Sequence, residues 1–157
     1  MHTNALSRND TSIAVLMLKN PFPLFPTIPE QDIMNICDPA TRQTLRTAYI
    51  ISHGYPSNYG QHLNCHCNIT TEPNQKMLLT FSDFAIEWSE GCQKDVLHIR
   101  DGGEEMVRCG RLLRNHNITS RSNRLDLELV TDGWKEHKGF WLQVEGTLVL
   151  YSLCGFI

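Results

Sequence analysis

The chain lacks the features that mark several large classes of protein. It has 157 residues, with 14 Lys and Arg against 17 Asp and Glu, so it carries no excess of positive charge for the phosphates of a nucleic acid. No apolar run approaches the roughly 20 residues that cross a bilayer. No Gly-x-Ser-x-Gly sequence is present to hold a strained nucleophilic serine. We therefore expect no nucleic-acid partner, no membrane span in this chain and no catalytic site.

A conventional secretion signal is also missing from the start of the chain. Residues 13–18 give only six apolar residues after a weakly charged start, and no clear small-residue cleavage site follows. Either the signal is atypical or the sequence is a fragment. Four prolines between 21 and 29 favour extended backbone, so residues 1–36 are interpreted as a leader and Pro-rich linker. A Pro-rich ligand for an aromatic groove is the alternative.

Cysteine and Asn-x-Ser/Thr sequences point to an oxidising compartment. The six cysteines form no Cys-x-x-Cys pair of the kind found in structural zinc sites, and an even number favours disulfides. Asn9, Asn68 and Asn117 each begin an Asn-x-Thr glycosylation sequence. Hydrophobic residues make up 41% of the chain, enough for a packed core. We predict a folded protein that is secreted or forms the extracellular part of a membrane protein.

From Cys37 onward the hydrophobic pattern has the period of two that is typical of half-buried strands. Turn-forming residues separate the strands at spacings that suit an antiparallel β-sandwich. We therefore predict an all-β, jelly-roll-like sandwich, and one short helix over residues 39–47 with Asp38 as its N-cap. The apolar side chains that alternate with polar neighbours, and that we expect in the core, are Met77, Leu79, Phe81, Leu125, Leu127, Leu129, Phe140, Leu142 and Val144.

Seven short motifs, in one order, resemble the CUB domain, a secreted β-sandwich module. They are Ser52-His53-Gly54-Tyr55-Pro56-Ser57-Asn58-Tyr59, Asn64-Cys65, the stretch from Leu79 to Glu87, the stretch from Cys92 to Gly102, Arg108-Cys109-Gly110, Ser122-Asn123-Arg124-Leu125 with Asp132, and Gly139-Phe140. Two departures from the family are His53 in place of a turn proline and Cys67 in place of a core tryptophan. The resemblance implies a CUB domain over residues 37–146, followed by a tail over 147–157.

The resemblance implies two disulfides, Cys37 with Cys65 and Cys92 with Cys109. Each would stabilise the fold by roughly 3 kcal/mol on the chain-entropy model. Cys67 and Cys154 remain, and in an oxidising compartment they either bond each other, bond other chains, or stay buried as thiols. If the segment around Cys65 is a strand, Cys65 and Cys67 share one face and Asn68 lies on the other, which predicts that a sugar on Asn68 points away from the core.

The resemblance also implies a calcium site. Matching the motifs puts Glu87, Asp95 and Asp132 on the positions that carry ligating carboxylates, with Tyr55 or Tyr59 as the supporting tyrosine. Calcium requires about six to eight oxygen ligands, which separated loops supply. The loop after Asp132 reads Gly133-Trp134-Lys135 and lacks the Ser or Asn oxygen usual in calcium-binding members, so backbone carbonyls would have to replace it. The alternative is that the three acids are solvated loop residues.

CUB modules elsewhere imply a non-catalytic recognition role for this chain. We expect calcium-ordered acidic loops to accept a Lys or Arg of an extracellular protein partner. Two alternatives stay open: an appended domain of a secreted protease, and calcium-independent binding of sulfated glycans. The glycan site would use Trp134, Trp141 and a locally basic stretch comprising Arg108, Arg111, Arg114, Arg121 and Arg124.

One further cluster suggests a transition-metal site. His62, Cys65, His66 and Cys67 lie close together in sequence, and their side chains are common metal ligands. If Cys65 and Cys67 form disulfides, however, neither can bind a metal, and a strand would direct His66 away from them. We therefore do not expect a metal there.

The role of residues 147–157 stays open in the sequence. The tail could finish a strand, begin a truncated membrane segment, or come from an alternative transcript.

Overall fold

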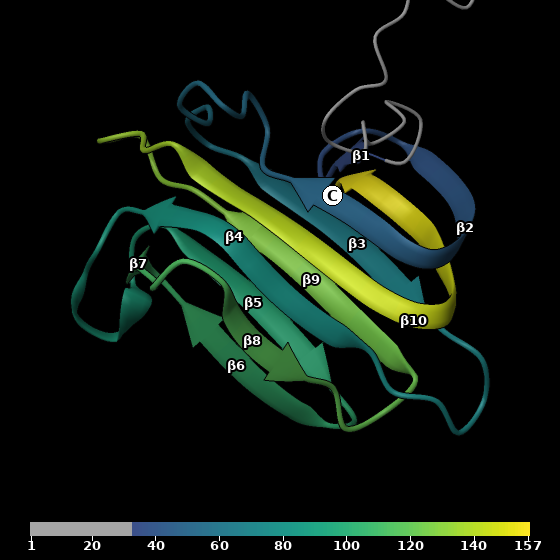
Figure 1. Ribbon diagram of the computed structural model, residues 1–157. Coiled ribbons are helices and arrows are strands. Elements are labelled where there is room, and N and C mark those ends of the chain that lie inside the picture. The colour runs from purple at the N-terminus through teal and green to yellow at the C-terminus, as the bar shows by residue number, and fades with distance from the viewer. Residues whose placement is uncertain (1–32) are drawn as a thin grey trace, which may run out of the picture.

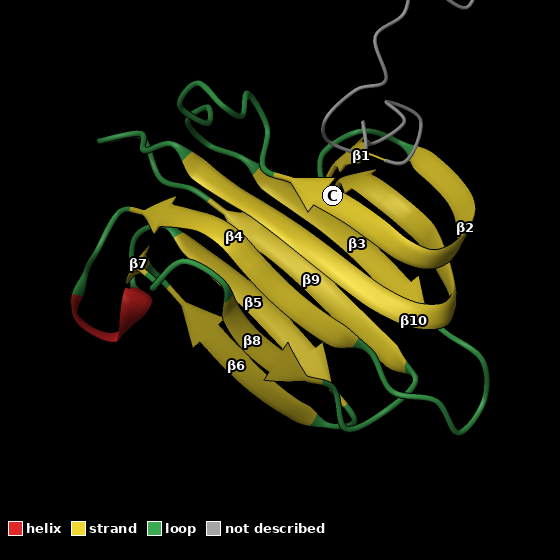
Figure 2. Ribbon diagram, viewed as in Figure 1, coloured by secondary structure: helices red, strands yellow, loops and turns green. Residues whose placement is uncertain are grey.

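The structure is a computed structural model that describes residues 33–157, without the side chains of 40–45, 151 and 153. Residues 1–32 of the predicted leader and linker, Asn9 among them, lie outside the described residues, whereas its last residues include β1 (Ile33–Asn35). Within these described residues, ten strands and one short 3₁₀ helix follow each other (Figures 1 and 2). They are β1 (Ile33–Asn35), β2 (Ala40–Ile51), β3 (Asn64–Thr70), β4 (Leu78–Ile86), η2 (Glu90–Cys92), β5 (Val96–Asp101), β6 (Glu104–Arg108), β7 (Gly110–Arg111), β8 (His116–Thr119), β9 (Arg124–Val130) and β10 (Gly139–Phe156).

The long strand β10 joins the two layers of a β-sandwich. It pairs with β2 along much of its length, with β4 through Gly139 to Glu145, and with β3 through Leu150 to Phe156. Beyond β3 the order is β9, β5 and β6, while β7 and β8 pair with β4. Every pairing is antiparallel except that of β1 with β2. The predicted all-β sandwich is confirmed.

The core lies between the layers, and the alternating apolar residues fill it. All nine side chains predicted from the period of two are 0–1% exposed. Phe81, Phe84 and Phe140 pack together, with ring centroids 5.2–6.3 Å apart. A strand with one buried face has a fixed register, because a slip of one residue would expose that face. The rigid strands therefore hold the loops at their ends in fixed relative positions.

The predicted helix over 39–47 is wrong, because these residues lie largely in β2. Ala40 pairs with Cys154 and Thr47 with Glu145 of β10. Arg46 has a φ of 71°, which no right-handed helix tolerates, and it lies at a β-bulge between the pairs formed by Leu45 and Thr47. Asp38 and proline 39 suited a helix start locally, but the long-range pairing with β10 decided the outcome.

Three disulfides tie the strands together. Cys37 bonds Cys65 and Cys92 bonds Cys109, the two pairs that the resemblance implies. Cys67 bonds Cys154, so these two cysteines neither bond other chains nor stay as buried thiols. This third disulfide fixes the end of β10 to β3 in the middle of its sheet.

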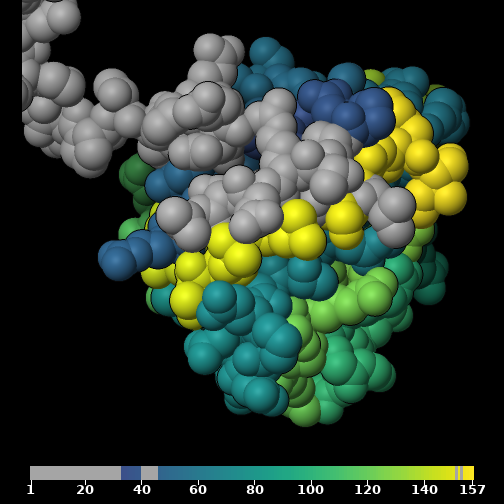
Figure 3. Space-filling model, turned by 90° about the vertical axis from the view of Figure 1, so that its right-hand side faces the viewer, coloured from purple at the N-terminus to yellow at the C-terminus, as the bar shows by residue number. Residues whose placement is uncertain are grey.

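Residues 147–156 belong to β10, so the tail finishes a strand. Its C-terminal part lies beside the first described residues (Figure 3): a Cβ built on Gly155 would be 3.5 Å from the Cα of Pro39. The Ile157 N–H donates to the Asn64 carbonyl at 3.0 Å. Within residues 33–157, no helix is long and apolar enough to cross a membrane.

Candidate metal-binding and recognition site

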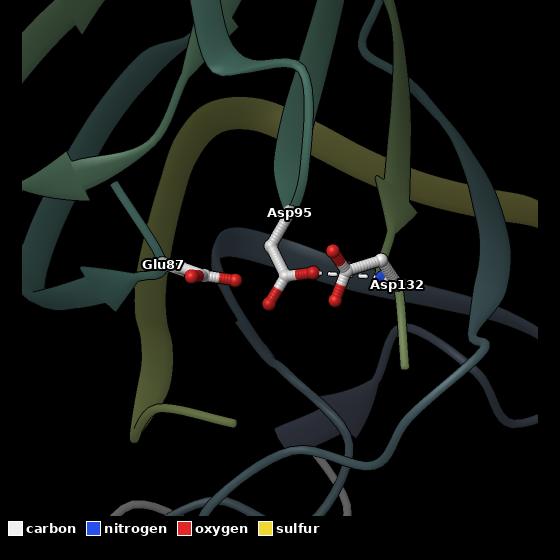
Figure 4. Close-up of side chains that lie close together, drawn as sticks. All are labelled: Glu87, Asp95 and Asp132. Atoms are coloured by element: carbon white, nitrogen blue, oxygen red, sulfur yellow. Dashed lines mark hydrogen bonds between the residues drawn. The ribbon is translucent and has the colours of Figure 1, made fainter. Parts of the chain in front are cut away.

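Three acidic residues meet at one end of the sandwich. Glu87 directly follows β4, Asp95 directly precedes β5, and Asp132 comes two residues after β9. The three side chains point toward one another (Figure 4), and one carboxylate oxygen from each lies within 4.8 Å of the others. We call these three residues the acidic cluster. The structure thus brings together the three carboxylates matched to a calcium site, and whether they bind calcium stays a prediction.

The acidic cluster is buried to an unusual degree for carboxylates. Glu87 is 3% exposed and Asp95 is 0% exposed, while Asp132 is half-buried. Burying charged groups of one sign together is strongly unfavourable unless a cation or hydrogen-bond donors compensate. The groups around the cluster therefore indicate what it is built to hold.

Tyr59 is the tyrosine that supports the cluster. Its hydroxyl donates to Asp95 Oδ2 at 2.5 Å and accepts the Glu87 backbone N–H at 3.0 Å, so it fixes two of the three acids relative to each other. Burial, together with the bond to Asp95, raises the pKa of Tyr59, which keeps the hydroxyl a donor. Tyr55, the other candidate, instead donates to Asp83 and does not belong to the cluster.

Asp95 holds the two loops together but keeps an unfavourable charge environment. Its Oδ1 accepts the Asp132 N–H at 2.8 Å. Burial raises the pKa of the Asp95 carboxyl, the hydrogen bonds from Tyr59 and Asp132 oppose this, and repulsion from Asp132 and Glu87 adds to it, so that the net pKa lies above the usual value. Protonation or a bound cation relieves this repulsion.

Lys94 contacts the acidic cluster, which the sequence motifs did not predict. Its ammonium Nζ lies 2.8 Å from Glu87 Oε1, and this hydrogen bond raises the pKa of Lys94. The other oxygen, Glu87 Oε2, is buried and has no hydrogen-bond partner. Lys94 directly precedes Asp95 in the sequence, and this adjacency is the sequence feature that could have indicated its contact with the cluster.

The donor set fits a calcium ion. The ligand candidates are all carboxylate oxygens, the hard ligands that calcium prefers, and Glu87 Oε2 is a buried acceptor without a donor. Lys94 balances one of the three carboxylates, which leaves the charge that a divalent cation neutralises. A transition metal would favour nitrogen or sulfur ligands, which the cluster does not contain.

The loop after Asp132 is shaped around the cluster despite its unusual sequence. The Trp134 N–H donates to Asp132 Oδ1 at 2.7 Å, and the His62 N–H donates to the Asp132 carbonyl at 2.9 Å. A Cβ at Gly133 would lie 2.8 Å from the His62 ring, so a larger residue there would have to displace that ring. Gly133 thus permits the approach of His62, which sequence alone did not suggest.

Two exposed tryptophans flank the cluster. Trp88 follows Glu87 directly and is 72% exposed, while Trp134 lies two residues beyond Asp132 and is 75% exposed. Trp88 packs one edge on the backbone of Gly110, where an added Cβ would be 3.1 Å from its ring. Exposed tryptophans of this kind are typical of binding surfaces.

The other sequence candidates do not form sites with the acidic cluster. Cys65 and Cys67 are bonded to Cys37 and Cys154, so neither is free to bind a metal beside His62 or His66. Of the residues considered for glycan binding, Arg114 and Trp141 line one cleft, while Arg121 pairs with Glu104 and Arg124 with Asp126. Trp134 lies in the loop of the cluster, and Trp141 lies on β10.

The two described glycosylation sequences differ in accessibility. As predicted, Asn68 lies on the opposite face of β3 from Cys67, but its side chain is only 5% exposed. Its Nδ2 lies 3.1 Å from His66 Nε2 and its Oδ1 accepts from Arg124 at 3.3 Å, so a sugar on Nδ2 would crowd the His66 ring. Asn117 on β8 is exposed. Glycosylation stays a prediction, and Asn117 is the position whose surroundings suit it.

Comparison with known proteins gives the family. The model of the CUB domain matches residues 37–143. Rat cubilin is 35% identical over 98 residues, which are 59% of this chain and 3% of cubilin. Human neuropilin-2 is 36% identical over 104 residues, 62% of this chain and 11% of neuropilin-2. The chain thus spans a small part of the curated relatives that it matches.

A solved structure resembles the fold. The crystal structure of the MASP-1 CUB2 domain bound to Ca²⁺ superposes with a TM-score of 0.59 at 26% identity, covering 65% of this chain and 94% of that domain. The family match spans more than half of the chain, the strands form the expected sandwich, and two disulfides link the expected cysteines. The chain belongs to the CUB domain family.

Proposed function

We propose that this chain is an extracellular, non-catalytic recognition module that binds calcium through Glu87, Asp95 and Asp132 and then accepts a Lys or Arg of a protein partner. The observation that carries the proposal is the buried Glu87 Oε2, which has no hydrogen-bond partner although it lies among three converging carboxylates. A buried acceptor in such surroundings is costly unless a cation completes the site.

The chain's own residues have separate tasks in this proposal. Calcium, when bound, would supply the positive charge that allows the three carboxylates to stay ionised side by side. Tyr59 positions Glu87 and Asp95, and the Asp132 N–H bonded to Asp95 keeps the third loop in place. Because the loops are held before a partner arrives, binding loses little conformational entropy.

Lys94 supports the choice of a basic partner. Its ammonium already contacts Glu87 at 2.8 Å, and half of its side chain is accessible to solvent, so the contact lies where an incoming side chain reaches it. We propose that the partner's Lys or Arg takes a place like that of Lys94 at the edge of the cluster. Such charge-assisted bonds to carboxylates are stronger than neutral ones.

Trp88 and Trp134 indicate the rest of the contact. Tryptophan is enriched among the residues that contribute most to protein–protein binding, and it attracts cations over its ring face. The proposed partner surface therefore carries a basic side chain surrounded by apolar groups. The Ca²⁺-bound MASP-1 CUB2 domain supports the calcium part of the proposal by similarity.

The test uses surface plasmon resonance with an immobilised lysine hexapeptide and a matched glutamine hexapeptide. We expect binding of the chain to the lysine peptide to increase with calcium and to fall when a chelator is added. Simple attraction to a protein of net charge −3 would instead weaken as calcium adds positive charge. Glu87→Gln should remove the calcium-dependent binding, and Glu90→Gln, an exposed acid three residues away, should not. Equal binding with calcium and chelator would refute the proposal.

A further inference from the structure

A second concave surface lies outside the acidic cluster. It is a cleft of about 560 Å³ on the outer face of β2, β10 and β4, and it shares no lining residue with the cluster. We call it the aromatic cleft. The residues that matter most in its lining are Tyr49, Tyr55, Asp83, Arg114, Lys138 and Trp141.

Strand register explains why aromatic rings gather there. Trp141 of β10 pairs with Ile51 of β2 and with Asp83 of β4, and Gln143 pairs with Tyr49. Since Leu142 between them is fully buried, Trp141 and Gln143 face outward. The Trp141 ring centroid lies 5.9 Å from that of Tyr49 and 5.8 Å from that of Tyr55, so three rings form a continuous row.

The polar groups beside the rings are fixed in place. The Tyr55 hydroxyl donates to Asp83 Oδ2 at 3.0 Å, and the Lys138 ammonium donates to the same oxygen. Lys138 also lies 5.3 Å from the centroid of the Tyr55 ring. These contacts hold Tyr55 beside Trp141, and they balance the charges of Asp83 and Lys138 against each other.

Arg114 is different from the other charged residues of the aromatic cleft. It is exposed, and within the described part of the chain no carboxylate lies at ion-pair distance from its guanidinium. It follows β7 and lies near Leu112 at the rim. The cleft therefore combines a row of rings with one guanidinium that is available to an anionic ligand.

We propose that the aromatic cleft binds a carboxylate-bearing saccharide, with a sugar ring against Trp141 and the carboxylate paired with Arg114. The C–H faces of a sugar pack on aromatic rings, while its hydroxyls require polar partners, which Gln143, Ser82 and Asp83 offer. A guanidinium matches a carboxylate in bidentate geometry. The mostly polar lining does not suit a purely apolar ligand, and one free guanidinium suits a single carboxylate rather than a densely sulfated chain.

The test follows the Trp141 indole N–H signal by ¹⁵N NMR during titration with 3′-sialyllactose, a glucuronate disaccharide, and uncharged lactose. We expect at least one acidic sugar to shift this signal with a Kd on the order of 1 mM, equally in calcium and in chelator, and lactose to bind about tenfold more weakly. Because calcium is not required, this result is independent of the proposed recognition function.

Variants assign the ligand to Arg114. Arg114→Gln should remove the preference for the acidic sugar over lactose, whereas Arg121→Gln, an exposed arginine paired with Glu104, should keep it. Both substitutions are at exposed positions, and an unchanged spectrum elsewhere establishes that the variants are folded. The proposal is overturned if neither acidic sugar shifts the Trp141 signal, if Arg114→Gln binds as wild type does, or if a glutamate hexapeptide binds as tightly as the acidic sugars.

Discussion

The two ends of strand β5 each carry a buried aspartate, and the charges around the two aspartates differ. Asp101 ends the strand and is 3% exposed, and Asp95 directly precedes it and is 0% exposed. Asp101 is surrounded by donors: Oδ2 accepts the Arg121 N–H at 2.5 Å, and Oδ1 accepts the N–H and hydroxyl of Ser122 at 3.0 and 2.7 Å. Each oxygen of Asp95 also accepts one hydrogen bond, from the Tyr59 hydroxyl and the Asp132 N–H, but Asp95 lies beside two further carboxylates.

The difference separates an acid whose charge the chain compensates from an acid in the proposed calcium site. At Asp101 the chain supplies the hydrogen bonds that a buried carboxylate needs, so the residue fixes the bend at Arg121 and Ser122 and requires no ligand. At Asp95 the compensation is incomplete, because Glu87 Oε2 beside it has no donor and burial raises the Asp95 pKa. Burial alone thus does not reveal a binding site, and the partners of the buried oxygens do.

The largest expected effect on stability comes from replacing Asp101. Asp101→Ala should lower the free energy of unfolding by about 3 kcal/mol, because it removes charge-assisted bonds and leaves donors unpaired. Urea denaturation should give the same loss in calcium and in chelator. Glu104→Gln, at an exposed neighbour, should have little effect. A loss at Asp101 that appears only with calcium would contradict the comparison.

Asp132→Ala tests the proposed calcium site at the other end of β5. Calcium at ten times its Kd should stabilise the wild type by about 1.4 kcal/mol through mass action, and the variant should lose this increment. Its stability in chelator should stay near that of the wild type, since repulsion from the neighbouring acids disappears with the carboxylate. Thermal unfolding in both buffers measures the two values. A variant that still responds to calcium would remove Asp132 from the site.

The pH dependence of stability should have opposite signs with and without calcium. The folded pKa of Asp95 lies above its usual value, so the native state binds a proton more readily than the unfolded chain. This contribution to stability is fully present below the unfolded pKa, about 3.9, and is lost as pH rises through the folded pKa. In chelator, acidification should therefore favour the fold through Asp95, whereas in calcium protons should compete with the ion.

Asp95→Asn is the matched variant for that titration, because it keeps the shape and removes the charge. The free energy of unfolding of this variant, measured in chelator from pH 7 downward, should lack the gain on acidification that is due to Asp95. If wild type and Asp95→Asn respond identically to pH in both buffers, the raised pKa has no role in folding.

The smallest expected effect concerns Lys94. Replacing it by alanine removes a positive charge from Glu87 and should tighten calcium binding a few-fold, since the ion no longer competes with the ammonium. Lys76→Ala, at an exposed lysine elsewhere, is the control. Weaker calcium binding in Lys94→Ala would mean that the lysine helps to build the site.

Local sequence patterns predicted much of the fold, and long-range contacts explain the failures. The period of two identified Phe81, Leu127 and Phe140 as core residues, because a half-buried strand imposes that alternation. Residues 39–47 were assigned to a helix because the N-cap signal at Asp38 is local, while the pairing of β2 with β10 is not. Likewise, the bond from Cys67 to Cys154 depends on two strands meeting in space.

The acidic cluster was predictable for a different reason. Glu87, Asp95 and Asp132 were identified by their motifs, since each lies next to a strand whose motif matches the family. Their partners were not: nothing in the sequence distinguishes Tyr59 from Tyr55, and the contact of Lys94 with Glu87 requires the actual loop conformation. The contrast between Asp95 and Asp101 is equally invisible until the donors around each are known.

The most direct measurement is isothermal titration calorimetry of calcium into the chelator-treated protein. The account predicts one site per chain with a Kd of about 0.1–1 mM, the range of extracellular modules, and little or no heat with magnesium, which prefers a tighter octahedral site. No binding heat at millimolar calcium would contradict it, and would mean that Gly133, Trp134 and Lys135 leave the three carboxylates without the remaining ligands that calcium needs.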